Sequence, residues 1–163
     1  MITDYSNNMT TEIIIRDAER TDYDFIFKLS PDLAKVANLT WHSGAIVSKM
    51  QDDYIAQMLN QTSVNNITLI AEKDGVSLGF VYACEHQDSI SNEACGTVPL
   101  LAVSAKAQGM GVGKLLMQAT EKWSKQQGYR LLHLEVFANN ENAKGFYNNM
   151  GFQPETLHMV KAL

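Results

Sequence analysis

The stretch Gln108-Gly-Met-Gly-Val-Gly113 decides the fold, because its glycines fall between a predicted strand and a predicted helix. Glycine has no Cβ, so its backbone can adopt positive φ angles and approach a ligand closely. At the start of a helix, backbone N–H groups lack helical partners and meet the positive end of the helix dipole. The stretch therefore predicts a site for a phosphate or pyrophosphate group.

Two common phosphate motifs do not match this stretch. A dinucleotide-binding turn has the pattern G-x-G-x-x-G, which would require glycine where Lys114 stands. A P-loop has the pattern G-x-x-x-x-G-K-[ST], which would require glycine at Gln108 and a hydroxyl residue at Leu115. The pattern that fits is Q/R-x-x-G-x-G/A, carried by Gln108, Gly111 and Gly113.

Regular patterns flank the turn on both sides. Residues 94–103 are predicted to form a strand, and Pro99 cannot donate to a sheet ladder, so we expect an edge or a bulge there. Apolar residues recur at helical spacing over 112–123, and Gly128 is expected to end that helix. A strand over 131–137 follows, and a helical crossover makes the two strands parallel.

The same signals place the other elements. Asp74-Gly75 predicts a hairpin turn, and Asn139 or Asn140 is expected to cap a last helix that ends at Gly151. The remaining predicted segments are strands at 12–16, 66–71 and 76–85, helices near 21–29 and 45–60, an irregular stretch over 31–43, and one or two strands within 152–163. This order predicts a mixed α/β, α+β-like fold with a mostly antiparallel central sheet and helices on both faces.

Composition limits the class of protein. The chain has 163 residues, 18 acidic and 13 basic, for a formal charge of −5. We expect one domain over residues 11–163 after a flexible N-terminal tail of residues 1–10. We expect no membrane partner, because no apolar run approaches the roughly 20 residues of a membrane span. Net acidity argues against a nucleic-acid partner, and Cys84 and Cys95 indicate no disulfide framework, so we expect a cytoplasmic protein.

The turn and its surroundings resemble the GNAT N-acetyltransferase superfamily. The resemblance covers residues 97–153 and, besides the turn, rests on Leu101-Ala-Val103, Leu134-Glu-Val136, Asn140-Glu-Asn-Ala143, Phe146-Tyr147 and Met150-Gly-Phe152. It implies a single GNAT-like domain in which the parallel strands over 94–103 and 131–137 are splayed. Two positions depart from the family pattern: Ala105 stands where proline is frequent, and Gln108 where arginine is commoner.

The resemblance implies acetyl-CoA as the co-substrate and no metal. Its pantetheine arm would lie in the gap between the splayed strands, along Leu101, Ala102 and Val103. Its pyrophosphate would meet backbone N–H groups of Gln108, Gly109, Met110, Gly111, Val112, Gly113 and Lys114. Asn140 and Ala143 would line the pantetheine and thiol end. Because Gln108 carries no charge, positive charge would come from Lys106, Lys114 and Lys144.

The implied reaction is transfer of an acetyl group to a primary amine by direct attack in a ternary complex. Tyr147 occupies the family's general-acid position, from which its phenol would donate to the departing sulfur. Many relatives carry a glutamate base on the strand where Thr97 and Pro99 stand here. The general base is therefore left open among Glu93, Glu85, His86 and His133, with Glu135 as a further carboxylate.

The acceptor class is also left open. Our first expectation is a small-molecule amine, for which the net acidity favours a cation. The alternatives are a protein N-terminus or lysine side chain, or no catalysis at all in an acyl-CoA-binding module. The absence of the usual glutamate supports the last of these. A homodimer is compatible with the resemblance.

Overall fold

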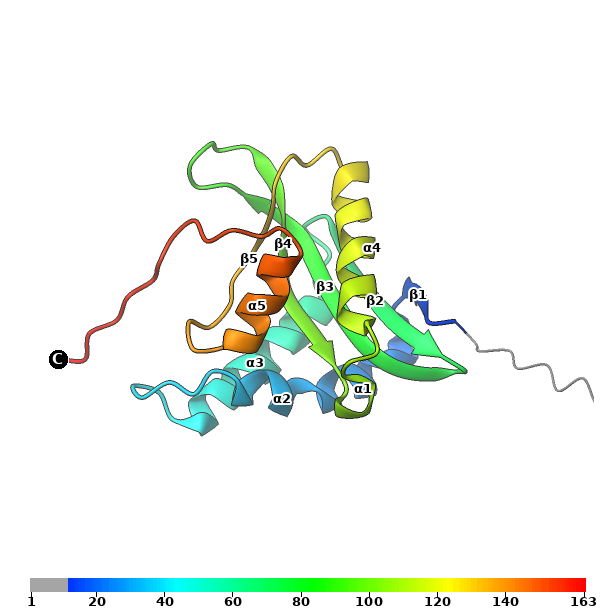
Figure 1. Cartoon of the computed structure of the whole chain (residues 1–163), viewed down its shortest axis with the longest axis horizontal. Helices are drawn as coiled ribbons and strands as arrows, with labels where there is room; N and C mark the ends of the chain where they lie inside the picture. Colours follow the sequence, from blue (N-terminus) through cyan, green and yellow to red (C-terminus); the bar gives the residue numbers. More distant parts are fainter. Residues whose placement is uncertain (1–11) are drawn as a thin grey trace, which may run out of the picture.

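The computed structural model describes residues 12–163, so the expected tail of residues 1–10 lies outside the described residues. A five-stranded sheet forms the centre, with its strands in the order in which they occur along the chain (Figure 1). The strands are β1 (Ile14–Asp17), β2 (Asn66–Lys73), β3 (Val76–Gln87), β4 (Ala94–Val103) and β5 (Leu132–Leu134). Neighbours are antiparallel except β4 and β5, which are parallel. The predicted mixed, mostly antiparallel sheet is confirmed.

Helices cover both faces of this sheet, as predicted (Figure 1). One face carries α1 (Tyr23–Lys28), α2 (Ser30–Lys35) and α3 (Gly44–Leu59), preceded by the 3-10 turn η1 (Arg20–Asp22). The other face carries α4 (Val112–Gln126) and α5 (Glu141–Asn149), and the short 3-10 turn η2 (Ala105–Ala107) lies between β4 and α4. No helix within residues 12–163 combines the length and the hydrophobicity that crossing a bilayer requires.

Two hydrophobic cores form because side chains alternate along the strands. On β3, Phe80 and Tyr82 join Ile26 and Ile55 of the helices on the first face. Val81 and Ala83 point the other way, and they pack with Val98 and with Leu116 and Met117 of α4. The sheet is thus buried on both faces.

Short-range turn chemistry is confirmed at several predicted positions. Asp74 and Gly75 have φ angles of 52° and 74°, the left-handed conformation that a tight hairpin needs. Gly128 and Gly151 follow α4 and α5 with φ angles of 80° and 93°. Asn140 caps α5, and its side chain accepts a hydrogen bond from the N–H of Ala143 at 3.2 Å.

One ion-pair group ties β1 to η1 and β2. Arg16 donates hydrogen bonds of 2.7 and 2.9 Å to the two carboxylate oxygens of Asp22, and one of 2.8 Å to Glu72. The Asp22 residue is only 5% exposed. Hydrogen bonds from Arg16 and from the N–H of Glu19 hold the pKa of the Asp22 carboxyl below its usual range.

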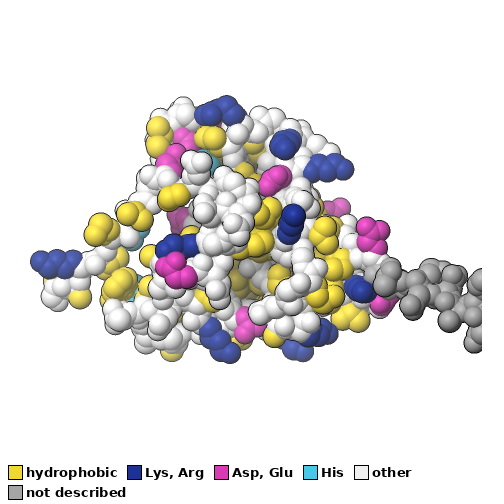
Figure 2. Space-filling view, in the orientation of Figure 1, with side chains coloured by type: hydrophobic (Ala, Val, Ile, Leu, Met, Phe, Trp, Pro, Cys, Tyr) yellow, Lys and Arg dark blue, Asp and Glu magenta, His cyan; other side chains and the backbone are white. Residues whose placement is uncertain are grey.

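Three predictions about elements are wrong. Residues 30–35 form α2 rather than irregular chain, because Pro31 lies in the first helical turn, where its missing N–H costs no hydrogen bond. β5 contains only Leu132–Leu134 rather than 131–137. Residues 152–163 form no strand: the segment leaves the body of the protein, with Leu157 and Met159 more than 80% exposed (Figures 1 and 2).

Candidate functional site

β4 has one edge that is only half paired. On one side it pairs with β3 from Ala94 to Val103, interrupted only at Val98 and Pro99. On the other side, β5 pairs only with Gly96, Thr97 and Val98. The edge from Pro99 to Val103 therefore has no strand partner among the described residues, because the chain turns away from β4 after β5. This is the gap that splayed strands produce.

A bulge at Pro99 reverses the direction of the backbone groups along β4. The N–H of Gly96 donates to the Leu131 carbonyl, towards β5, at 3.0 Å. The N–H of Ser104 donates to the Leu78 carbonyl, towards β3, at 2.8 Å. Residues 96 and 104 are an even number of steps apart, so in a regular strand both N–H groups would face the same neighbour. The shift in register opposite Pro99 reverses the alternation.

This reversal determines which N–H groups line the gap. Since the N–H of Ser104 faces β3, that of Ala102 faces β3 as well, and those of Leu101 and Val103 face the unpaired edge. The side chains of Leu101 and Val103 pack against the core on the α4 side. Their backbone groups are therefore held in place and can pair with an extended ligand.

The glycine-rich turn lies just beyond this edge. Gly109 and Gly111 have φ angles of 80° and 78°, and a Cβ at either would meet no atom within 4 Å. Glycine is required there by backbone conformation rather than by crowding. Gly113 differs: a Cβ would lie 3.3 Å from the ring of Phe146, so this glycine allows α5 to pack closely on the start of α4.

A row of backbone donors opens at the start of α4. The first backbone bond of this helix runs from the N–H of Leu115 to the carbonyl of Gly111 at 3.1 Å. Within residues 12–163, the N–H groups of Gly109, Gly111, Val112, Gly113 and Lys114 have no protein acceptor. Gln108 and Met110 are less available, because their N–H groups bond to Ala105 and Ala107 at 3.4 and 3.3 Å. The free groups and the helix dipole suit a phosphate group.

The candidate lysines differ in availability. Lys106 and Lys114 are exposed beside the turn and form no ion pair with another described residue. Lys144 donates instead to Glu141 at 2.8 Å and to the Ala138 carbonyl at 3.1 Å. Lys106 and Lys114 are thus the cations that an anion at the turn would meet.

Tyr147 lies on α5 within the apolar layer between that helix and the sheet. Its ring packs edge-on against Phe146 and Phe152, with ring centroids 5.1 and 5.8 Å away. Burial raises the pKa of the Tyr147 phenol to about 12. Its hydroxyl forms no hydrogen bond with the side chains and backbone described from residue 12 onward. A protonated and unengaged phenol can donate to a ligand atom. The side-chain Oδ1 of Asn140, by contrast, already accepts a hydrogen bond from the N–H of Ala143 at the α5 cap.

Most of the candidate bases either lie far from the unpaired edge of β4 or already pair with another side chain. Glu93 precedes β4 and pairs with Arg130, which lowers the Glu93 pKa. At the usual rise per residue, about 33 Å of strand separates Glu93 from Val103, so Glu93 lies far from the end of β4. Glu85 accepts a 2.6 Å hydrogen bond from Tyr129. His86 is exposed, 6.2 Å from the ring of His133, and His133 faces Asp88 at 3.2 Å.

Glu135 follows β5 directly and has no ion pair or hydrogen bond with the side chains described in residues 12–163. Leu132 and Leu134 pack on the α4 side, so residues 133 and 135 point to the α3 side. Tyr54 of α3 lies on that side. Its pKa is raised to about 12, mainly by burial and then by the charges of Cys84 and Glu135. Glu135 is therefore near the sheet face below α3, at the end of β5 where the gap opens.

Sequence reasoning assigned no role to Ser104. Its hydroxyl is buried between β4 and η2, and it has no hydrogen-bond partner among the described residues. A buried polar atom without a partner is costly unless a ligand or water satisfies it. A serine between a strand and a glycine-rich turn is the signal that could have identified it.

The fold and the site together define an acetyltransferase scaffold. Residues 33–152 match the model of the acetyltransferase (GNAT) family, and the chain belongs to that family. This is the family that the sequence motifs resemble.

Its relatives differ in how much of their length they share. The peptidyl-lysine N-acetyltransferase YiaC of Escherichia coli (strain K12) is 30% identical over 139 residues, which cover 85% of this chain and 82% of that protein. A mycothiol acetyltransferase of Paenarthrobacter aurescens (strain TC1) is 36% identical over 84 residues, or 52% of this chain. That match spans only 26% of the relative's length.

Similarity of fold extends further than similarity of sequence. An aminoglycoside N-acetyltransferase, solved in complex with CoA, matches with a TM-score of 0.71 at 18% identity. The match covers 93% of this chain and 95% of that one. At this level of identity the similarity supports the fold alone.

Proposed function

We propose that this chain transfers the acetyl group of acetyl-CoA to a primary amine by direct attack within a ternary complex. The observation that carries the proposal is the unpaired edge of β4 ending at a row of free backbone N–H groups. An extended arm followed by a pyrophosphate matches this sequence of donors. Bound acetyl-CoA would supply the activated thioester. The residues of the chain bind it and transfer the protons.

The chain holds the two parts of such a ligand differently. The N–H groups of Leu101 and Val103 bind the amide-containing arm as a neighbouring strand would. The N–H groups of Gly111, Val112 and Gly113 bind the pyrophosphate, assisted by the dipole of α4 and by Lys106 and Lys114. Most of this binding uses backbone, so the formal charge of −5 does not oppose an anionic ligand.

Two side chains serve proton transfer in this proposal. Tyr147 keeps its proton at neutral pH and donates it, or a hydrogen bond, towards the departing sulfur. Glu135 accepts the proton of the amine, directly or through water, because it is the candidate carboxylate that is not engaged by Arg130 or Tyr129. The N–H of Val103, which faces the gap, stabilises negative charge that develops on the carbonyl oxygen.

A small amine and a lysine side chain present the same ammonium group, and both fit this chemistry. We propose a small, cationic amine as the first candidate. A lysine side chain of a protein is the second, favoured by YiaC, which matches this chain over most of both lengths.

The test is release of CoA thiol from acetyl-CoA across a panel of acceptors. The panel contains polyamines, an aminoglycoside, amino acid derivatives and lysine-containing peptides, and acetyl-CoA binding is measured in parallel by calorimetry. Stimulated release with one class of amine supports transfer to that class. Binding without stimulated release for any acceptor selects a non-catalytic acyl-CoA-binding module. Absence of binding contradicts the proposal entirely.

A further inference from the structure

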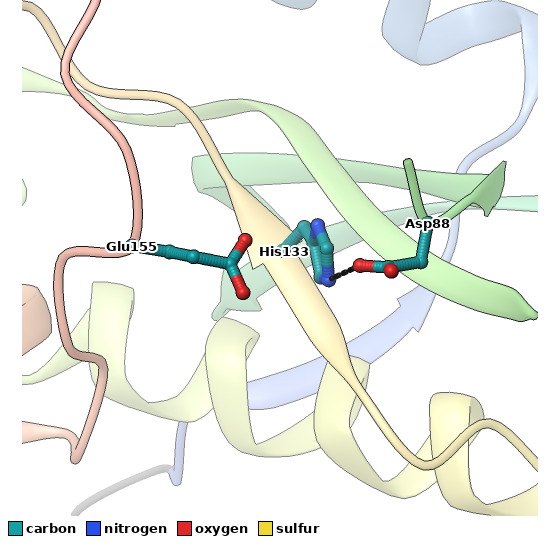
Figure 3. A group of neighbouring side chains, drawn as sticks. All are labelled: Asp88, His133 and Glu155. Atoms are coloured by element: carbon teal, nitrogen blue, oxygen red, sulfur yellow. Dashed lines mark ion pairs between the residues drawn. The ribbon is translucent and has the colours of Figure 1, made fainter. Parts of the chain in front are cut away.

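Three side chains from distant segments converge beside β5, next to the paired half of β4 (Figure 3). His133 comes from β5, Asp88 from the loop after β3, and Glu155 from the C-terminal segment. One ligand atom of each lies within 4.8 Å of the other two. In Figure 3 the imidazole lies between the two carboxylates.

Asp88 is prearranged for this contact. The residue is only 2% exposed. Its Oδ1 accepts hydrogen bonds from the N–H groups of Ile90 and Ser91 at 2.9 and 2.5 Å, while its Oδ2 lies 3.2 Å from Nε2 of His133. The hydrogen bonds from Ser91 are the main cause of a pKa below the usual range for Asp88. One oxygen orients the carboxylate, and the other is left for a ligand.

The charges of the cluster are unbalanced. Two carboxylates face a single imidazole, and no lysine or arginine among the described residues forms an ion pair with Asp88 or Glu155. The nearby guanidinium of Arg130 is engaged by Glu93. A buried carboxylate beside a second one is stabilised by a cation placed between them.

We propose that Asp88, His133 and Glu155 bind a divalent transition-metal ion, for which Zn²⁺ is the best chemical match. Zn²⁺ accepts one imidazole and two carboxylates as ligands, and bond lengths of 2.0–2.2 Å in a tetrahedron place ligand atoms about 3.4 Å apart. The 3.2 Å between His133 and Asp88 is already close to this spacing. Glu155 is exposed on a segment without regular structure, so its side chain can move inward. Water completes the fourth position.

Such an ion would attach the C-terminal segment to the edge of the sheet. Residues 152–163 contribute no strand, and Glu155 is their only residue in the cluster. The proposed role is therefore structural, and it is independent of acetyl transfer.

The test is titration of the full chain with Zn²⁺ by calorimetry, for the wild type and for Asp88→Asn and Glu155→Gln. Asparagine retains the oxygen that accepts from Ile90 and Ser91, and Glu155 is exposed, so both variants are expected to fold. We expect one saturable site in the wild type, weakened at least about tenfold in each variant. His158→Ala, three residues further along the same segment, is the control and is expected to leave the affinity unchanged.

Replacing the probe with Co²⁺ identifies the ligands by visible absorption. A spectrum of nitrogen and oxygen ligation that is lost in both variants supports the site. A thiolate charge-transfer band would show that a cysteine such as Cys95 holds the ion, and this overturns the proposal. No saturable binding, or an unchanged affinity in either Asp88→Asn or Glu155→Gln, overturns it as well.

Discussion

Gly79 of β3 faces the carbonyl oxygen of Ala102 so closely that a Cβ at residue 79 would lie 2.7 Å from that oxygen. The same Cβ would lie 3.2 Å from both the Cα of Val103 and a methyl group of Val112. Gly79 therefore sets how closely β3 approaches the end of β4, where the unpaired edge meets the glycine-rich turn.

Gly79→Ala is expected to lower the free energy of unfolding by about 2–3 kcal/mol, because the nearest atoms belong to backbone and cannot move aside. At about 2–4 °C per kcal/mol, the melting temperature falls by roughly 4–12 °C. Thermal unfolding followed by circular dichroism measures this. Gly44→Ala is the control: its Cβ meets nothing within 4 Å at the start of α3, so stability should be unchanged or slightly raised. Equal melting temperatures for wild type and Gly79→Ala would contradict the crowding argument.

Tyr147→Phe removes the phenol but keeps the ring that packs against Phe146 and Phe152. We expect kcat to fall about 10²-fold, with little change in the KM for acetyl-CoA or in melting temperature. Because the pKa of Tyr147 is raised to about 12, its ionisation produces no fall in rate below about pH 10. Steady-state kinetics from pH 6 to 10 check both points. Tyr23→Phe, on α1 across the sheet, is the matched control, and an equal loss there would remove Tyr147 from the mechanism.

Glu135→Gln tests the proposed base. We expect kcat/KM to fall about 10²-fold, because glutamine cannot accept the proton. Glu93→Gln breaks the pair with Arg130 just before β4 and should leave kcat/KM unchanged. If Glu93→Gln lost activity and Glu135→Gln did not, the assignment of the base to Glu135 would be wrong.

Arg16→Met tests the ion-pair group that joins β1, η1 and β2. The side chain of Asp22 is 6% exposed and that of Arg16 is 31% exposed, so removing Arg16 leaves a mostly buried carboxylate without its partner. We expect a loss of about 2 kcal/mol at pH 7, below the value for a fully buried pair because of the exposure of Arg16. Lys49→Met breaks the exposed Lys49–Asp53 pair and should change stability by less than about 0.5 kcal/mol.

The same pair predicts how stability depends on acid. The folded pKa of Asp22 is lowered, so the stabilisation is present above the unfolded pKa of about 3.9 and is lost as the pH falls below it. Urea unfolding gives the free energy of unfolding at pH 7 and at about pH 3. The difference between these two values should be smaller for Arg16→Met than for the wild type. An identical difference would mean that other carboxylates cause the acid dependence.

Local chemistry accounts for the parts of the fold that the sequence predicted well. The left-handed residues Asp74-Gly75, Gly128 and Gly151 and the cap at Asn140 each depend on a few adjacent residues, and all four positions are confirmed. The bulge at Pro99 is confirmed for the same reason, since proline removes a donor wherever it stands.

The parts that depend on distant segments were predicted less well. One or two strands were expected within 152–163, but a strand needs a neighbour, and the segment has none in the structure. The candidate base Glu93 is engaged by Arg130, 37 residues away, and Glu85 by Tyr129, 44 residues away. A single sequence does not show such pairings, so it could list the carboxylates near the site but not choose among them.

The half-paired edge of β4 also has a consequence for solubility. From Pro99 to Val103 it exposes strand backbone that a second chain could join, and unprotected edges of this kind promote aggregation. The bend at Pro99 limits the length over which a foreign strand can align. A ligand lying along Leu101 and Val103 would cover the remaining part of this edge. If acetyl-CoA binds as proposed, the protein should therefore be most resistant to self-association in the bound state.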